Sequence, residues 1–147
     1  MNRISESVAA AGLALVLLTA GAAPASAASY KHGREAACLP PGAGCSPGIV
    51  VKTWHKKGST ARGVGWVYAS LELTGKRRVH HARWLYQRPG GKLTAASGWK
   101  RAPRVTDTTF VETHWGRDGR TGPQYPKGTR VCIEFRETGK RACVKLR

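Results

Sequence analysis

Apolar and polar residues alternate along most of the chain from Ile49 onward. The alternating runs are short and are separated by turn residues, among them Gly58, Pro103 and the segment 89–91. Alternation with a period of two between such breaks predicts half-buried β-strands. No window of helical length carries a 3.6-residue apolar repeat, so the pattern predicts an all-β domain.

Seven strands are predicted from this pattern. They cover residues 49–56, 63–73, 78–87, 93–100, 108–115, 129–136 and 141–146. Short strands at this spacing are typical of two antiparallel sheets packed as a sandwich. We therefore expect a single antiparallel β-sandwich over residues 49–147. Residues 28–48 contain Pro and Gly without periodicity, and they predict an irregular N-terminal segment.

The alternation also assigns side chains to faces. In the second predicted strand, Val67 and Leu71 fall on one face and Tyr68 on the other. The same counting places Val131, Ile133 and Phe135 together in the sixth predicted strand. For tryptophans in strand patterns, a place in the core is the more frequent role than a ligand platform. We therefore interpret three of the tryptophans as core residues: Trp66, Trp84 and Trp115.

Four cysteines follow an N-terminal segment with the features of a signal peptide. Three pairings are possible, and we favour two local disulfides, Cys38–Cys45 and Cys132–Cys143. Joining the last two predicted strands as a hairpin places Cys132 directly across from Cys143 on an outward face, as a cross-strand disulfide requires. A zinc site is the alternative, but the chain contains no C-x-x-C spacing.

Residues 1–27 are interpreted as a secretory signal peptide. Arg3 provides a positive N-terminal region, residues 8–20 form a short apolar run, and residues 25–27 (ASA) match a cleavage site. A membrane-spanning helix needs about 20 apolar residues, which this run does not reach. We expect a secreted protein, extracellular or associated with the cell envelope, without a transmembrane segment.

The formal net charge is +17, from 25 Lys and Arg against 8 Asp and Glu. Removal of residues 1–27 takes away one base, Arg3, and one acid, Glu6, so the excess stays with the folded part. Such a charge destabilises a compact chain by self-repulsion, and clustered basic residues are typical of proteins that bind anionic polymers. The alternative is that these charges only form a solvated surface.

The basic residues occur in clusters next to aromatic residues, a combination that suits binding of phosphate groups and flat rings. The strongest candidates for binding a polyanion are Lys76, Arg77, Arg78 and Arg83. The second group is Arg117 and Arg120, in a long loop at 116–128 that surrounds Tyr125 and that is either functional or simply flexible. The third group is Lys56, Lys57, Lys100 and Arg101.

Two alternatives to a binding protein depend on other residues. Glu112 and His114 lie two apart in a predicted strand, and with Arg117 they form the acid, base and phosphate clamp that a small secreted ribonuclease needs. A disulfide Cys38–Cys45 would enclose a proline-containing loop, as in a protease inhibitor with a preorganised binding loop. No metal or cofactor motif is present in the sequence, and no catalytic residue is assigned.

Residues 84–90 (WLYQRPG) resemble the C strand and following turn of an immunoglobulin variable domain. The resemblance implies an aromatic strand in a sandwich core, while the Cys–Trp–Cys spacing of that family is absent. At the level of architecture, the whole chain resembles small basic secreted β-sandwich proteins of GC-rich bacteria, most of them without an assigned activity. The sequence therefore predicts a non-enzymatic protein that binds an anionic polymer or surface, without a cofactor. Its oligomeric state is left open.

Overall fold

The computed structural model describes residues 28–38, 46–76 and 79–147. These residues form ten β-strands, and all the strand pairs are antiparallel. The strands are β1 (Tyr30–Cys38), β2 (Gly48–Lys56), β3 (Ala61–Glu72), β4 (Val79–Gln87), β5 (Thr94–Ala95), β6 (Lys100–Pro103), β7 (Phe110–Gly116), β8 (Gln124–Pro126), β9 (Arg130–Phe135) and β10 (Arg141–Lys145). The all-β prediction is confirmed.

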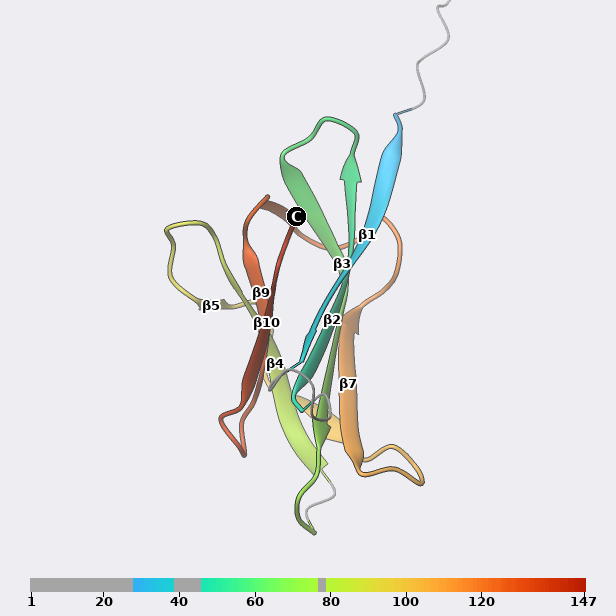
Figure 1. Cartoon of the computed structure of the whole chain (residues 1–147), viewed down its shortest axis with the longest axis vertical. Helices are drawn as coiled ribbons and strands as arrows, with labels where there is room; N and C mark the ends of the chain where they lie inside the picture. The colour runs from blue at the N-terminus through green and yellow to red at the C-terminus, as the bar shows by residue number, and fades with distance from the viewer. Residues whose placement is uncertain (1–27, 39–45, 77–78) are drawn as a thin grey trace, which may run out of the picture.

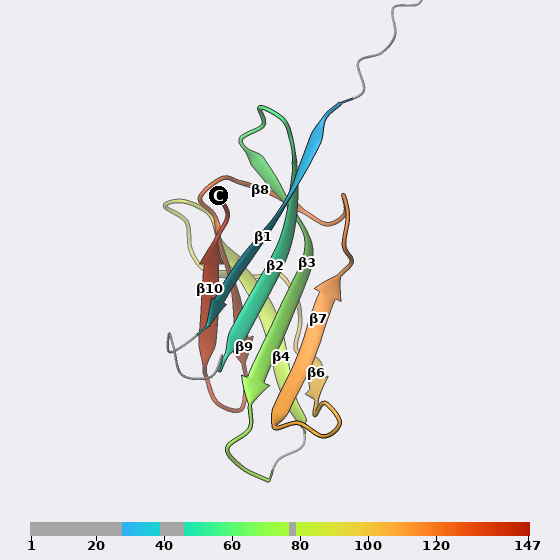
Figure 2. The ribbon, with the colours of Figure 1, turned by 45° about the vertical axis from the view of Figure 1, so that its right-hand side comes forward.

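The strands form two sheets of five strands each. The first has the order β1-β2-β3-β7, with β8 also paired to β3, and the second has the order β10-β9-β4-β5, with β6 also paired to β4. Figure 1 shows the two sheets side by side, and Figure 2 shows the first sheet from its outer side with the second behind it. The chain crosses between the sheets after β3, β6 and β8.

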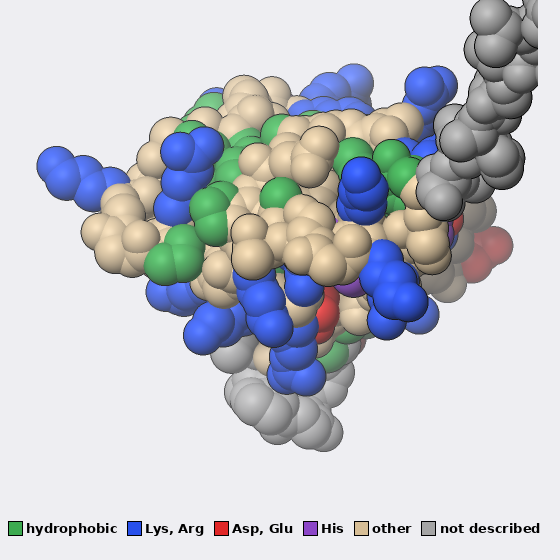
Figure 3. Space-filling model, turned by 90° about the horizontal axis from the view of Figure 1, so that it is seen from above, with side chains coloured by type: hydrophobic (Ala, Val, Ile, Leu, Met, Phe, Trp, Pro, Cys, Tyr) green, Lys and Arg blue, Asp and Glu red, His purple; other side chains and the backbone are tan. Residues whose placement is uncertain are grey.

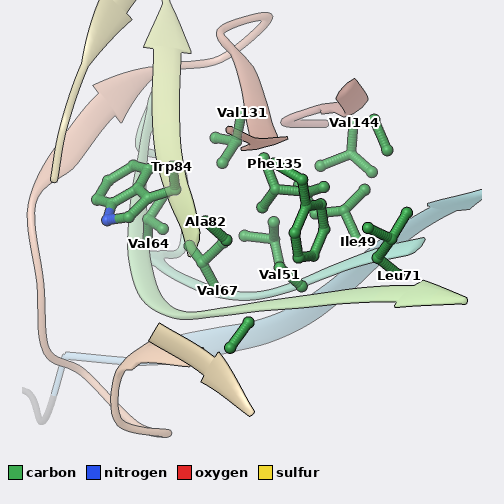
Figure 4. Close-up of a cluster of buried hydrophobic side chains, with 14 of the residues drawn as sticks. Ile49, Val51, Val64, Val67, Leu71, Ala82, Trp84, Val131, Phe135 and Val144 are labelled. Atoms are coloured by element: carbon green, nitrogen blue, oxygen red, sulfur yellow. The ribbon is translucent and has the colours of Figure 1, made fainter. Parts of the chain in front are cut away.

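One hydrophobic core lies between the inner faces of the sheets (Figure 4). Val51 and Leu71 enter it from the first sheet, and Ile133 and Phe135 from the second, each at most 1% exposed. Leu71, Ile133 and Phe135 lie on the strand faces that alternation predicts to be apolar, because successive side chains of a strand point to opposite faces. Trp84 is also buried in this core, as predicted.

A β-bulge in β3 interrupts the alternation. The pairing passes from Lys52–Trp66 to Thr53–Val64, so Gly65 is an extra residue without a partner on β2. A bulge of this kind returns the next side chain to the other face. Val64 therefore points into the core, although strict counting would place it on the outer face with Trp66.

Residues 28–48 are not irregular as a whole, contrary to the prediction. Residues 30–38 form β1, which pairs with β2 over nine residue pairs and forms an edge of the first sheet. Most side chains of β1 are exposed. Because an edge strand is held by backbone hydrogen bonds rather than by a buried face, its sequence carries little hydrophobic periodicity. The predicted count of seven strands was therefore too low.

The predicted strand 93–100 is also wrong in its extent. The structure has only the two-residue β5 there, followed by β6 at 100–103. Between them Ser97 Oγ accepts a hydrogen bond from the Trp84 backbone N–H at 3.0 Å, in place of a strand carbonyl. The loop at 116–128 likewise contains β8, whose Tyr125 is buried in the core rather than exposed for binding.

The terminal hairpin is as predicted. Cys132 lies directly across from Cys143, and the two form a disulfide. Both cysteines lie on the outer face of the second sheet. Cys132 is nevertheless fully buried there, beside Leu85, its partner on β4. Cys45 lies outside the described residues, so the pairing Cys38–Cys45 stays a prediction, as does the leader at 1–27.

Candidate anion-binding faces

Basic residues are spread over several sides of the molecule. In the view from above, Lys and Arg side chains project around much of the visible surface, and few Asp or Glu side chains are visible among them (Figure 3). Two outer faces combine positive charge with aromatic rings in different ways. We call them the arginine face, on the second sheet, and the aromatic face, on the first.

The arginine face is the outer side of strands β4, β6, β9 and β10, where strand register brings basic residues together. Its basic residues are Arg83, Arg101, Arg130, Arg136, Arg141 and Lys145. At its centre, Glu134 lies between two arginines on neighbouring strands: Arg83 donates to one carboxylate oxygen at 2.8 Å, and Arg141 to the other at 2.7 Å. Burial raises the pKa of Glu134, but the hydrogen bonds from these two guanidinium groups outweigh it and leave the pKa below its usual value.

Trp99 lies beside this network. It is 37% exposed, and it is the only large hydrophobic residue among the described ones that is exposed rather than buried or half-buried. The guanidinium carbon of Arg83 is 4.4 Å from the centre of a Trp99 ring, and that of Arg136 is 6.0 Å from it. Cation–π contacts of this kind place both guanidinium groups beside the ring, and Arg83 is held at the same time by Glu134.

His81 and Glu137 form a second pair at the edge of the arginine face. Glu137 accepts from the backbone N–H of His81 at 2.9 Å, and its other oxygen lies 2.8 Å from His81 Nδ1. Burial raises the pKa of Glu137, but these hydrogen bonds hold it at about 2. The two carboxylates of this part of the described chain therefore have intramolecular partners: Glu134 accepts from two guanidinium groups, and Glu137 contacts the backbone N–H and the imidazole of His81.

The aromatic face is the outer side of β1, β2, β3 and β7. Its rings are those of Tyr30, Trp54, Trp66, Tyr68 and His114. The Trp66 and Tyr68 rings are stacked, with centroids 5.5 Å apart and planes within 15° of each other. Trp66 is partly exposed on the sheet surface, so its interpretation as a core residue was wrong.

Basic residues surround these rings. Lys52 Nζ is 5.4 Å from the centre of a Trp66 ring, and the Arg120 guanidinium carbon is 4.3 Å from that of Tyr30. A hollow of about 350 Å³ is lined by Arg34, Val50, Lys52, Trp66 and Tyr68. Lys52 also forms an ion pair with Asp118, in the loop after β7.

The predicted site residues do not share one face. Arg83 and Arg101 lie on the arginine face, and Arg120 contacts a ring of the aromatic face. Lys100 Nζ donates to the His114 carbonyl at 2.6 Å, linking β6 to β7 at the side of the sandwich.

The other predicted residues lie in turns, at strand ends or outside the description. Lys56 ends β2, Lys57 follows it, and Lys76 is exposed in the connection between β3 and β4. Arg117 is exposed in the loop that follows β7. Arg77 and Arg78 lie outside the described residues, so the leading candidate cluster is described only in part.

Several basic residues of the two faces were missed in the sequence. Arg136 and Arg141 flank the turn between β9 and β10, but their neighbours Trp99 and Arg83 come from segments more than 35 positions away. Arg34 was missed because β1 was not predicted. Alternation does place Lys52 on the same face as Trp54, and this was the available signal for the aromatic face.

The structure describes the residues of the ribonuclease alternative but not the loop of the inhibitor alternative. Glu112 and His114 both lie on the aromatic face, where the Tyr68 phenol is hydrogen-bonded to Glu112. Burial raises the pKa of Tyr68, and so does this contact. With Arg104 these residues line a second hollow, of about 380 Å³. The proposed inhibitor loop at 39–44 lies outside the described residues.

No protein-family model, curated protein or solved structure matches the chain. Among the residues that the structure describes, no helix is long and apolar enough to cross a membrane. In the same part of the chain, no three His, Cys, Asp or Glu side chains lie close enough together to hold a metal ion. The two faces are therefore the basis for any functional conclusion.

Proposed function

We propose that this is a secreted, non-enzymatic protein that binds an anionic polymer through the arginine face. The observation that carries the proposal is the set of arginines around Trp99 and Glu134. Arginine binds phosphate and carboxylate groups through two parallel hydrogen bonds, which a lysine cannot provide in the same geometry. Arg83 comes from β4, Arg141 from β10 and Arg136 from the turn after β9, so the pairing of these strands fixes their spacing.

Charge and preorganisation both favour this face. The net charge of +17 attracts polyanions at long range, and release of their counterions drives binding. Glu134 and the Trp99 ring hold Arg83 in place before a ligand arrives, so less side-chain entropy is lost on binding. Arg101 and Arg136 are exposed, with no carboxylate among the described residues within ion-pair distance, and can bind an anion directly.

A salt titration with a charge-reversal variant tests the proposal. The purified protein is titrated with teichoic acid, duplex DNA and single-stranded RNA at increasing salt, and tryptophan fluorescence reports binding. The variant Arg101→Glu/Arg136→Glu is expected to weaken binding and to reduce the salt slope by about two. The matched control is Lys31→Glu/Lys127→Glu, which changes the net charge equally at exposed positions outside both faces.

Three results would contradict the proposal. Equal losses in the two variants would show that total charge, not the arginine face, determines binding. Absence of binding to all three polymers at low salt would exclude an anionic polymer of these classes as the partner. RNA products on a gel that disappear in Glu112→Gln would show that the protein is a nuclease.

A further inference from the structure

The aromatic face has a chemistry that the arginine face lacks. Trp66 and Tyr68 occupy alternate positions of β3 and are both partly exposed, next to a hollow rimmed by two basic side chains. Large rings on the outer side of a sheet contribute less to stability than the same rings in the core, because much of their surface stays in water. Their presence there is explained if a ligand covers them.

We propose that the aromatic face binds single-stranded nucleic acid, with an unpaired base stacked in the hollow against Trp66 and Tyr68. Sheets that display aromatic side chains at neighbouring positions bind unpaired bases in this way, whatever the base, because each base has a flat π face. Arg34 and Lys52 line the same hollow and are placed to contact the adjoining phosphates. The site shares no residue with the arginine face, so it stands or falls independently of the proposed function.

The charged groups of the hollow favour an anionic backbone over a neutral sugar chain. Its lining contains two cations and a phenol, but no carboxylate and no amide side chain. Sugar hydroxyls both donate and accept hydrogen bonds, and among the side chains of this lining only the Tyr68 phenol can accept. Phosphate oxygens only accept, which matches Arg34 and Lys52.

The geometry also favours single strands over duplexes. In a duplex the bases are stacked on one another inside the helix, where side chains standing on a sheet have no access to their faces. The hollow, of about 350 Å³, has the volume for a single base beside the Trp66–Tyr68 stack. Arg120, which lies over Tyr30, extends the positive surface along the same face for the following phosphates.

Variants at Trp66 test the proposal against two control ligands. Binding of a fluorescein-labelled oligothymidylate is compared with that of inorganic polyphosphate, which has charge without rings, and polygalacturonate, which has acidic sugars. Trp66→Leu is expected to weaken oligothymidylate binding about tenfold and to leave polyphosphate binding unchanged. Trp66→Phe, which keeps a flat ring, is expected to retain most of the affinity.

Opposite results overturn the proposal. It fails if oligothymidylate does not bind, if Trp66→Leu binds it as tightly as the unmodified protein, or if a hairpin duplex competes equally well. A dependence on Trp66 that appears with polygalacturonate and not with the oligonucleotide would assign the face to acidic sugars instead. Arg101→Glu/Arg136→Glu tests the arginine face separately, because neither residue lines the hollow.

A measurement on the unmodified protein covers the case in which a variant does not fold. Oligonucleotides with 5-bromouracil are crosslinked to the protein by light, and the labelled peptides are identified by mass spectrometry. Crosslinks to the β3 peptide that contains Trp66 and Tyr68 are expected. Crosslinks confined to Trp99, on the arginine face, would contradict the proposed site.

Discussion

The arginine face and the aromatic face are built on the same scaffold and differ in what holds their side chains. On the arginine face, ion pairs cross three strands, from Arg83 through Glu134 to Arg141. On the aromatic face, ring contacts dominate, and the ion pair that the described residues form there, Lys52–Asp118, is exposed. The first face suits recognition of charge, and the second suits recognition of flat rings. Strand alternation determines which side chains point outward. The chemistry of each outer face depends on which of these side chains lie next to one another on neighbouring strands.

The largest expected effect is a loss of stability in the sheet that carries the arginine face, when its disulfide is removed. Removing the disulfide with Cys132→Ala/Cys143→Ala is expected to lower the free energy of unfolding by about 3 kcal/mol. The reason is that the unfolded chain gains conformational entropy once Cys132 and Cys143 are no longer linked. Hydrogen exchange should accelerate in β9 and β10, under the arginine face, more than in β2 and β3. Equal acceleration in all four strands would show that the two sheets do not respond separately.

The second prediction perturbs the aromatic face alone. The Trp54 ring lies against Gly63, and a Cβ at this position would be 2.1 Å from Trp54 Cε2. Gly63→Ala is therefore expected to displace Trp54 and to lower the free energy of unfolding by about 1–3 kcal/mol in urea denaturation. The salt slope of polyphosphate binding should not change, because the arginine face is untouched. A changed slope would show that the faces are coupled.

The third prediction uses acid to weaken the arginine face. The pKa of Glu137 is about 2 in the folded protein against 4.5 as its ordinary value, so its contribution to stability is complete above pH 4.5 and is lost as the pH falls toward 2. We expect the melting temperature by calorimetry to fall across this window. Glu137→Gln should make the fall shallower, while Glu35→Gln, on the edge strand β1, should not. Identical slopes for both variants would assign the acid sensitivity to other carboxylates.

The smallest expected effect sharpens the assignment of Lys52. The hydrogen bond from Lys52 is the main cause that holds the pKa of Asp118 below its usual value. Asp118→Asn removes the competing charge and should tighten oligothymidylate binding about two- to threefold, in the range of an exposed ion pair. Polyphosphate binding at the arginine face should tighten less. If Asp118→Asn weakened oligothymidylate binding, Asp118 would be positioning Lys52 rather than competing for it.

Local sequence predicted the strands that contribute a buried face. β2, β3, β4, β7, β9 and β10 each place apolar residues on alternate positions, and their predicted bounds agree within two residues. β1, β5, β6 and β8 escaped correct prediction because they are short or lie at sheet edges. Strand β1 in particular is held by nine backbone pairs to β2 and buries little, so its sequence carries no signal of its own.

The candidate faces were less predictable than the strands. The sequence groups Arg83 with its chain neighbours Lys76–Arg78, of which the structure describes only Lys76; in the structure Arg83 contacts Trp99 and shares Glu134 with Arg141. Trp66 was interpreted as a core residue, although alternation relative to Val67 placed it outside. Neighbours along the chain were taken as neighbours in space, and in an antiparallel sheet that assumption holds only near turns.

The sequence by itself determined the all-β class, the inward residues and the hairpin that pairs Cys132 with Cys143. Each of these depends on the period of two, which is a local property of the chain. The tertiary structure alone decided that Trp99 lies beside Arg83 and Arg136, that Gly65 forms a bulge, and that β1 completes the hollow against Trp66. Those outcomes depend on the register between distant strands, which the packing of both sheets on one core sets and no single segment encodes.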